Sequence, residues 1–104
     1  LLFSGLKDIN GITLLENKDD RETSAWLFTM RVARKSDFIE KMKSKGIATS
    51  QVHNRNDQNS CVFPFRCELP NIDKLEQDLI CLPVGWWIEE DDIQYIIDSI
   101  KEDW

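Results

Sequence analysis

The stretch WLFTMRVARKSDFIEKMKSKGI, residues 26–47, decides the fold. Its first half places an apolar side chain at every second position, and successive side chains of a β-strand point to opposite faces. We therefore predict a strand over Ser24–Ala33. One face of that strand would carry Trp26, Phe28, Met30 and Val32.

The second half of the stretch predicts a short helix. Asp37 and Glu40 have the spacing of a capping box, in which two side chains satisfy free N–H groups at a helix start. The apolar face of this helix would carry Phe38, Ile39 and Met42. Gly46 is expected to end it, because glycine enters the left-handed conformation without strain.

Apolar segments on either side extend this unit. Ile47–Val52 predicts a second strand that completes a strand–helix–strand unit, and Ile12–Leu15 and Leu79–Leu82 predict two more strands. The last helix is the clearest, with an apolar stripe at helical spacing that follows the acids Glu89–Asp92. That stripe consists of Ile93, Ile96, Ile97 and Ile100.

Shorter predictions complete the chain. Leu1–Lys7 predicts the end of a helix. Cys61–Phe65 predicts a short apolar segment on which the chain returns. A further helix, capped by Asn71 or Asp73, is predicted to run to about Asp78. Together these elements predict the α+β class, as a small, mainly antiparallel sheet with helices on one face.

The composition is that of one small globular domain. Its 104 residues are 41% hydrophobic and 31% charged, enough for a core without metal or disulfide staples. The net charge of −6 disfavours nucleic acid as a partner, because that binding depends on Lys and Arg at phosphates. The apolar runs are too short to span a membrane, and Lys7 and Asp8 interrupt the first one before a signal-peptide core can form.

No self-sufficient active site is predicted. The three cysteines, Cys61, Cys67 and Cys81, lack metal-site spacing and indicate reduced thiols in a cytoplasm. The four glycines are too widely spread for a phosphate-binding loop. We therefore predict no catalytic residue and no metal site on this chain.

One polar segment is a candidate for binding. Residues 53–60, HNRNDQNS, are eight consecutive polar residues that hold the only histidine. Loops at strand ends commonly carry binding groups, although most are ordinary exposed connections. Composition alone favours the ordinary connection.

Four segments, in their order, resemble the small C-terminal domain of sugar aminotransferases of the DegT/DnrJ/StrS family. They are WLFTMRV (26–32), KSDF (35–38), KGI (45–47) and LPVG (82–85), the last followed by an acidic turn and the isoleucine-striped helix. The resemblance covers about Ile12 to Ile100. It implies the small domain of a fold type I enzyme that uses pyridoxal phosphate to aminate nucleotide-linked keto sugars.

The resemblance also implies what lies elsewhere. The cofactor-binding lysine and phosphate groups belong to the family's large N-terminal domain, so none of the lysines here takes that role, and this domain alone would be inactive. In the family, the segment after the second strand lines the substrate side of the cleft, and the enzymes are expected to be homodimers. On this chain the substrate-binding candidates are His53, Arg55, Asn56 and Asp57.

The expected domain organisation is a single domain, 1–104. Its residues 1–11 would be the remnant of the helix that connects to the large domain, because the chain opens without Met, as after a cut into a longer polypeptide. Two alternatives stay open, a stand-alone ferredoxin-like regulatory or ligand-binding module and a protein-interaction module. The adjacent indoles of Trp86 and Trp87 would pack either on the large domain or in this domain's own core.

Overall fold

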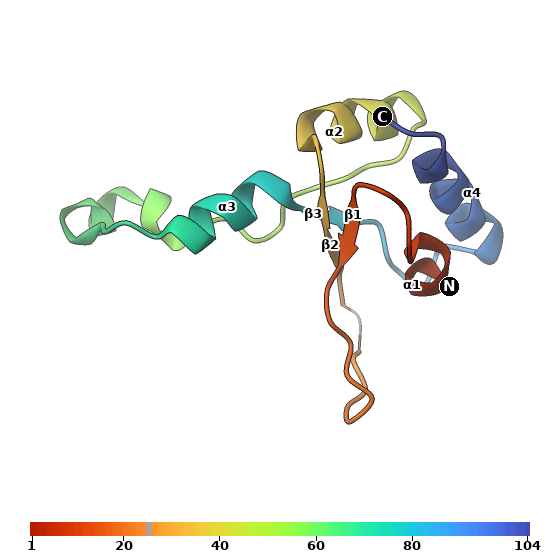
Figure 1. Ribbon diagram of the computed structural model, residues 1–104, viewed down its shortest axis with the longest axis horizontal. Helices are drawn as coiled ribbons and strands as arrows, with labels where there is room; N and C mark the ends of the chain where they lie inside the picture. Colours follow the sequence, from red (N-terminus) through yellow and green to blue (C-terminus); the bar gives the residue numbers. More distant parts are fainter. Residues whose placement is uncertain (25) are drawn as a thin grey trace.

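Strand β2 (Phe28–Val32) forms the centre of the sheet in the computed structural model, which describes residues 1–24 and 26–104. It pairs in antiparallel fashion with β1 (Ile12–Leu14) on one side and with β3 (Leu79–Leu82) on the other. The strand order is β1-β2-β3 (Figure 1). The predicted α+β class with an antiparallel sheet is confirmed.

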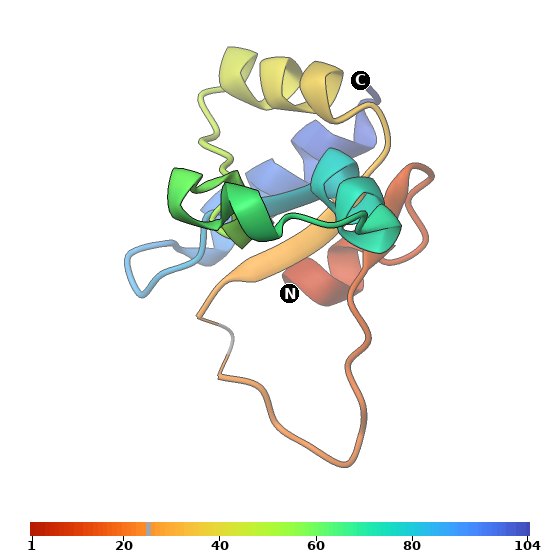
Figure 2. The same cartoon turned by 90° about the vertical axis from the view of Figure 1, so that its left-hand side faces the viewer.

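Residues 1–24 and 26–104 contain six helical segments besides the sheet. Four are α-helices, α1 (Leu2–Leu6), α2 (Lys35–Ser44), α3 (Pro70–Asp78) and α4 (Glu90–Lys101), and two are short 3₁₀ helices, η1 (Asn56–Gln58) and η2 (Ser60–Phe65). Figure 2 shows α4 behind the sheet and α3 in front of it. None of these helices, in the part of the chain that the structure describes, is long and apolar enough to cross a bilayer.

The core lies between the sheet and helices α1, α2 and α4. Met30 and Val32 of β2 point into it, as the alternation predicts, and Ile80 and Leu82 of β3 lie beside them. The helices contribute Leu2, Leu6, Phe38, Met42, Ile96, Ile97 and Ile100, all buried. Because these helices share one face, the predicted placement of the core helices is correct.

Strand β2 is shorter than predicted. The apolar alternation continues back to Trp26, but Trp26 is 74% exposed and only Phe28–Val32 is paired. Strand β2 begins only at Phe28, because Phe28 already pairs with Leu82, the last residue of β3, and no partner strand extends further. Ala25, inside the predicted strand, lies outside the described residues.

The predicted strand Ile47–Val52 is wrong. Only Ser50 forms a bridge, through its N–H and its carbonyl to Cys81 of β3, at 3.2 and 2.8 Å. Beyond Ser50 the side chain of Gln51 is bound by Lys35, and the chain leaves the sheet edge. Cys61–Phe65 is likewise helical rather than an extended return, with Pro64 inside the 3₁₀ turn.

Two predicted helix starts are also wrong. Helix α2 begins two residues before Asp37, after Arg34 in the left-handed conformation, and no side chain caps it. Helix α3 begins with Pro70 rather than at Asn71 or Asp73, because proline lacks the N–H that is free at this position.

Helix α4 starts at a capping box that the sequence pattern did not predict. The N–H of Glu89 donates to the Asp92 carboxylate at 3.1 Å, and the Glu89 side chain accepts a backbone N–H of the first turn in return. The acidic start is thus a capping arrangement as well as a complement to the helix dipole.

Helix α2 ends as predicted at Gly46. The N–H of Ile47 donates to the carbonyl of Met42 at 2.9 Å, and that of Gly46 to Lys43 at 3.0 Å. This pair of bonds is a Schellman motif, and it requires the left-handed conformation that Gly46 has, with φ at +74°.

Replacing Gly46 by Val is expected to lower the free energy of unfolding by about 1–2 kcal/mol, because a branched side chain is strained at positive φ. No atom lies within 4 Å of the added Cβ, so crowding does not contribute. Urea unfolding of the chain measures the effect, and Gly46→Asn is the control with a smaller loss. Equal losses for Val and Asn would contradict this explanation.

Candidate functional site

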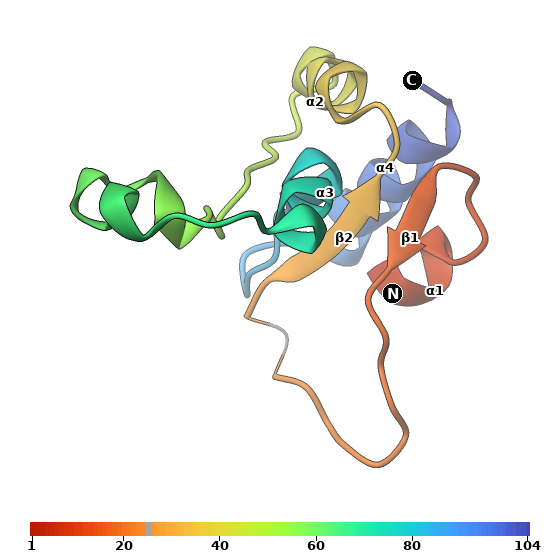
Figure 3. The ribbon, with the colours of Figure 1, turned by 60° about the vertical axis from the view of Figure 1, so that its left-hand side comes forward.

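The polar segment 53–60 begins a long excursion from the sheet. After the bridge at Ser50 the chain passes through η1 and η2 and returns along α3, and Figure 3 shows this arm reaching away from the sheet. Within η1, η2 and α3, all of which the structure describes, no residue is buried. Polar contacts at its base therefore hold the two ends of this arm together.

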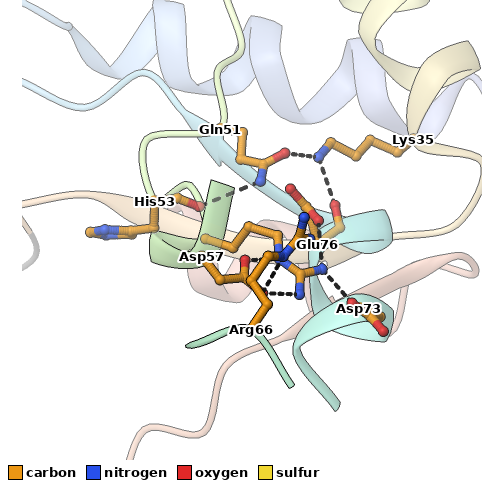
Figure 4. A network of polar contacts seen from close by, with 8 residues as sticks. Lys35, Gln51, His53, Asp57, Arg66, Asp73 and Glu76 are labelled. Atoms are coloured by element: carbon orange, nitrogen blue, oxygen red, sulfur yellow. Dashed lines mark hydrogen bonds and ion pairs between the residues drawn. The ribbon is translucent and has the colours of Figure 1, made fainter. Parts of the chain in front are cut away.

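Arg55 lies at the centre of those contacts. Figure 4 labels the carboxylates that it binds, Asp57, Asp73 and Glu76. Its Nε and Nη2 donate to the two carboxylate oxygens of Asp57, the second at 2.7 Å. Its Nη1 donates to Asp73 and, at 3.4 Å, to Glu76, both on α3. The side chains of Arg55 and Asp57 are each 15% exposed, so this ion pair is largely enclosed.

The electrostatics of the pair follow from this geometry. The Arg55 hydrogen bonds hold the pKa of the Asp57 carboxyl below its ordinary value, while partial burial opposes the shift. Arg66 adds a weaker attraction, with its Nε 3.8 Å from Asp57. The hydrogen bonds that Arg55 donates to Asp57 and then to Asp73 raise the pKa of Arg55 above its already high value, so it stays charged.

A lowered pKa in the folded state makes stability depend on pH. The contribution of Asp57 is present above its unfolded pKa of about 4 and is lost as the pH falls through the lower folded value. We expect Asp57→Asn to destabilise the chain at pH 6, and the difference from wild type to shrink below pH ~4. Urea unfolding across pH 2–6 measures it.

Asp20 provides the matched control. Its pKa is also lowered, through a hydrogen bond from Arg21, but the two residues are adjacent and exposed in a loop. Because neighbours in sequence stay close in the unfolded chain, Asp20→Asn should change neither stability nor its pH dependence. An equal effect at both positions would contradict a role for the Asp57 fold contacts.

A second set of hydrogen bonds connects α2 to the same loop. Lys35 Nζ donates to the side-chain oxygen of Gln51 and, at 3.1 Å, to the carbonyl of Glu76. The Gln51 amide in turn donates to the carbonyl of His53 at 3.4 Å. The backbone at His53 is thus linked to both α2 and α3.

The side chains of His53 and Asn56 remain at the surface. Both residues are exposed, and in Figure 4 the imidazole points away from the ionic network. The His53 ring lies edge-on to Trp26, with 6.4 Å between ring centroids. The structure therefore divides the four candidates into an exposed pair, His53 and Asn56, and an enclosed pair, Arg55 and Asp57.

Several members of this network were not predicted. Lys35, Gln51, Asp73 and Glu76 come from other segments, and only the i, i+3 spacing of Asp73 and Glu76 signals that two carboxylates share one helix face. In residues 1–24 and 26–104, no three His, Cys, Asp or Glu side chains are arranged to hold a metal ion.

The polar network around Arg55 does not fit pyridoxal phosphate. A lysine that binds the cofactor aldehyde must be free, but Lys35, the lysine of this network, is bound to Gln51 and Glu76. Arg55 is paired with carboxylates rather than free for a phosphate group. The polar network is thus no cradle for this cofactor.

Apolar surface adjoins the other end of the sheet. A hollow of about 550 Å³ is lined by α1, the ends of β1 and β2, and side chains that include Leu27, Val84 and Ile93. Trp86 and Trp87 lie on the loop after β3 and are 93% and 63% exposed. The prediction that they pack in this domain's own core is therefore wrong.

Comparison with known proteins gives the chain's relatives. The model of the DegT/DnrJ/EryC1/StrS aminotransferase family matches residues 1–101. Among solved structures, sugar aminotransferase CalS13 from Micromonospora echinospora superposes with a TM-score of 0.92 at 38% identity, and AtS13 from Actinomadura melliaura with 0.92 at 35%. The comparison with curated proteins found no match.

A more distant structure shares the fold. PseC from Helicobacter pylori, an aminotransferase involved in the biosynthesis of pseudoaminic acid, superposes with a TM-score of 0.80 at 17% identity. The superpositions on CalS13 and AtS13 each cover 97% of this chain but only 27% of the other. The chain thus spans about a quarter of the length of these relatives, and it belongs to the DegT/DnrJ/EryC1/StrS aminotransferase family.

Proposed function

We propose that this chain is the C-terminal small domain of a pyridoxal-phosphate-dependent aminotransferase that acts on nucleotide-linked keto sugars. The observation that carries the proposal is the 38% identity to the sugar aminotransferase CalS13 over 97% of this chain. In the intact enzyme this domain closes the substrate cleft, and alone it is inactive.

The cofactor is assigned to a large domain outside this chain. The polar network has no free lysine or phosphate cradle, and the relatives are almost four times as long as the aligned region. Bound there, pyridoxal phosphate carries the amino group between donor and sugar. Residues 1–11 would connect the two domains, and the apolar hollow beside α1 and the exposed Trp86 and Trp87 would pack on the large domain.

The polar loop is the proposed substrate-facing segment. His53 and Asn56 have exposed side chains that can donate to and accept from sugar hydroxyls. Arg55 and Asp57 instead hold the loop in shape, because their charged groups are bound to each other and to α3. The intact enzyme is proposed to be a cytoplasmic homodimer.

The test compares the intact enzyme with this chain. The intact enzyme should bind pyridoxal phosphate, seen as a visible absorbance band, and transfer an amino group from glutamate to a nucleotide-linked keto sugar. The 104-residue chain should do neither. Stoichiometric cofactor absorbance on the chain alone, or an intact enzyme that aminates only substrates without a nucleotide, would overturn the proposal.

The exposed indoles of Trp86 and Trp87 favour one second candidate, a protein-interaction module. Large exposed aromatic groups mark interaction surfaces, and these two lie edge-on to each other at 6.0 Å. The substitution Trp87→Ser in the intact enzyme separates the candidates. Under the aminotransferase proposal it weakens the contact between domains and lowers activity, whereas an interaction module would lose partner binding with unchanged amino transfer.

A further inference from the structure

We propose that Arg55 is a positioning residue, which clamps the polar loop onto α3 so that His53 faces the substrate, and that it does not bind the substrate's diphosphate. The proposal rests on the proposed function only for the role of His53. The clamp itself is a property of this chain.

The first argument is the use of the Arg55 donors. A guanidinium has five N–H groups. Nε and Nη2 are directed at Asp57, and Nη1 at Asp73 and Glu76. These contacts use four of the five donors, and the side chain is 15% exposed. A diphosphate approaching Arg55 would have to displace carboxylates that already occupy the paired-donor geometry.

The second argument is charge. The network contains the three cations Lys35, Arg55 and Arg66 and the three carboxylates of Asp57, Asp73 and Glu76. Its formal charge is therefore 3 − 3 = 0. A network without net charge gives a diphosphate no net attraction, and it presents no barrier to neutral sugar hydroxyls.

The third argument is that two ties converge around His53. Arg55, two residues further on, is bound to α3, while the His53 carbonyl accepts from Gln51, itself held by Lys35 of α2. Lys35 also donates to the Glu76 carbonyl, so both ties end on the same turn of α3. The backbone of His53 is fixed while its imidazole stays exposed (Figure 4).

The substitution Asp73→Asn in the intact enzyme separates positioning from diphosphate binding by the sign of its effect. If Arg55 positions the loop, Asp73→Asn and Arg55→Met should both raise KM for the sugar substrate, by about tenfold, since small misplacements of a binding group are costly. The inhibition constants of thymidine diphosphate and uridine diphosphate should stay within about twofold of wild type, because the diphosphate is bound elsewhere. If Arg55 binds the diphosphate, Asp73→Asn frees it and tightens inhibition, while Arg55→Met weakens inhibition. Either of these results overturns the proposal.

A double-mutant cycle with His53 tests the route of the effect. In a His53→Ala background, Arg55→Met should change KM far less than in the wild type, because both substitutions remove the same contact. Additive effects would overturn the proposal. Arg55→Lys should have a KM nearly as high as that of Arg55→Met, because the lysine ammonium cannot bridge Asp57 and α3 as the planar guanidinium does. The control is Arg21→Met, which removes an exposed arginine that forms an ion pair with its neighbour Asp20 and should leave KM unchanged.

Limited proteolysis gives a readout that does not depend on activity. Arg55→Met and Asp73→Asn should each increase cleavage between Gln51 and Phe65 relative to Arg21→Met, with an unchanged thermal midpoint for the rest of the enzyme. Unchanged cleavage would show that the clamp does not hold the loop. If wild-type enzyme aminates no nucleotide-linked sugar, the proposed function fails, whereas the cleavage result still decides the clamp.

Discussion

Replacing Phe38 by Ala is expected to lower the free energy of unfolding by about 3–5 kcal/mol, the cost of removing a large buried aromatic group. Phe38 is fully buried at the start of α2 and lies edge-on to the Trp104 ring, with 5.2 Å between centroids. The Ala variant therefore loses buried area and an aromatic contact together. Urea unfolding of the 104-residue chain, followed by circular dichroism, measures the change.

The control for Phe38 is Ile39→Ala on the same helix. Ile39 is only partly buried at the edge of the core, so Ile39→Ala should lower the free energy of unfolding clearly less than Phe38→Ala. Because both variants place Ala in α2, the change in helix propensity is favourable in each and cannot explain the difference. Equal losses would contradict the central position of Phe38 in the core.

Replacing Ile100 by Ala is expected to lower the free energy of unfolding by about 2–5 kcal/mol, through lost burial and the cavity that remains. Ile100 is fully buried in the last turn of α4, in the cluster that contains Leu6 and Phe38. The same substitution at Ile93, which is only partly buried, should cost less. A larger loss at Ile93 would mean that the isoleucine stripe meets the core at its other end.

The periodic elements could be predicted because their pattern repeats. The stripe from Ile93 to Ile100 places four branched side chains on one helix face, and the structure buries or partly buries all of them. The strand Leu79–Leu82 and the glycine end of α2 were correct for similar local reasons. In each case one short segment contains the whole signal.

Prediction failed where distant partners decide the conformation. Ile47–Val52 has strand-forming residues, but the chain makes one bridge at Ser50 and then follows side-chain contacts of Gln51. The candidate site shows the same limit. Sequence places His53 and Arg55 two residues apart, yet their different environments come from α3, whose Asp73 lies 18 residues beyond Arg55.

The packing of α1 against α4 has a consequence for synthesis on the ribosome. Leu2 and Leu6 share one core with Ile96, Ile97 and Ile100, so the first and last helices complete each other. A nascent chain cannot close this core until Ile100 has left the exit tunnel. Until then β2 and Phe38 lack the cover of these helices, and apolar surface exposed in an unfinished chain is prone to aggregation.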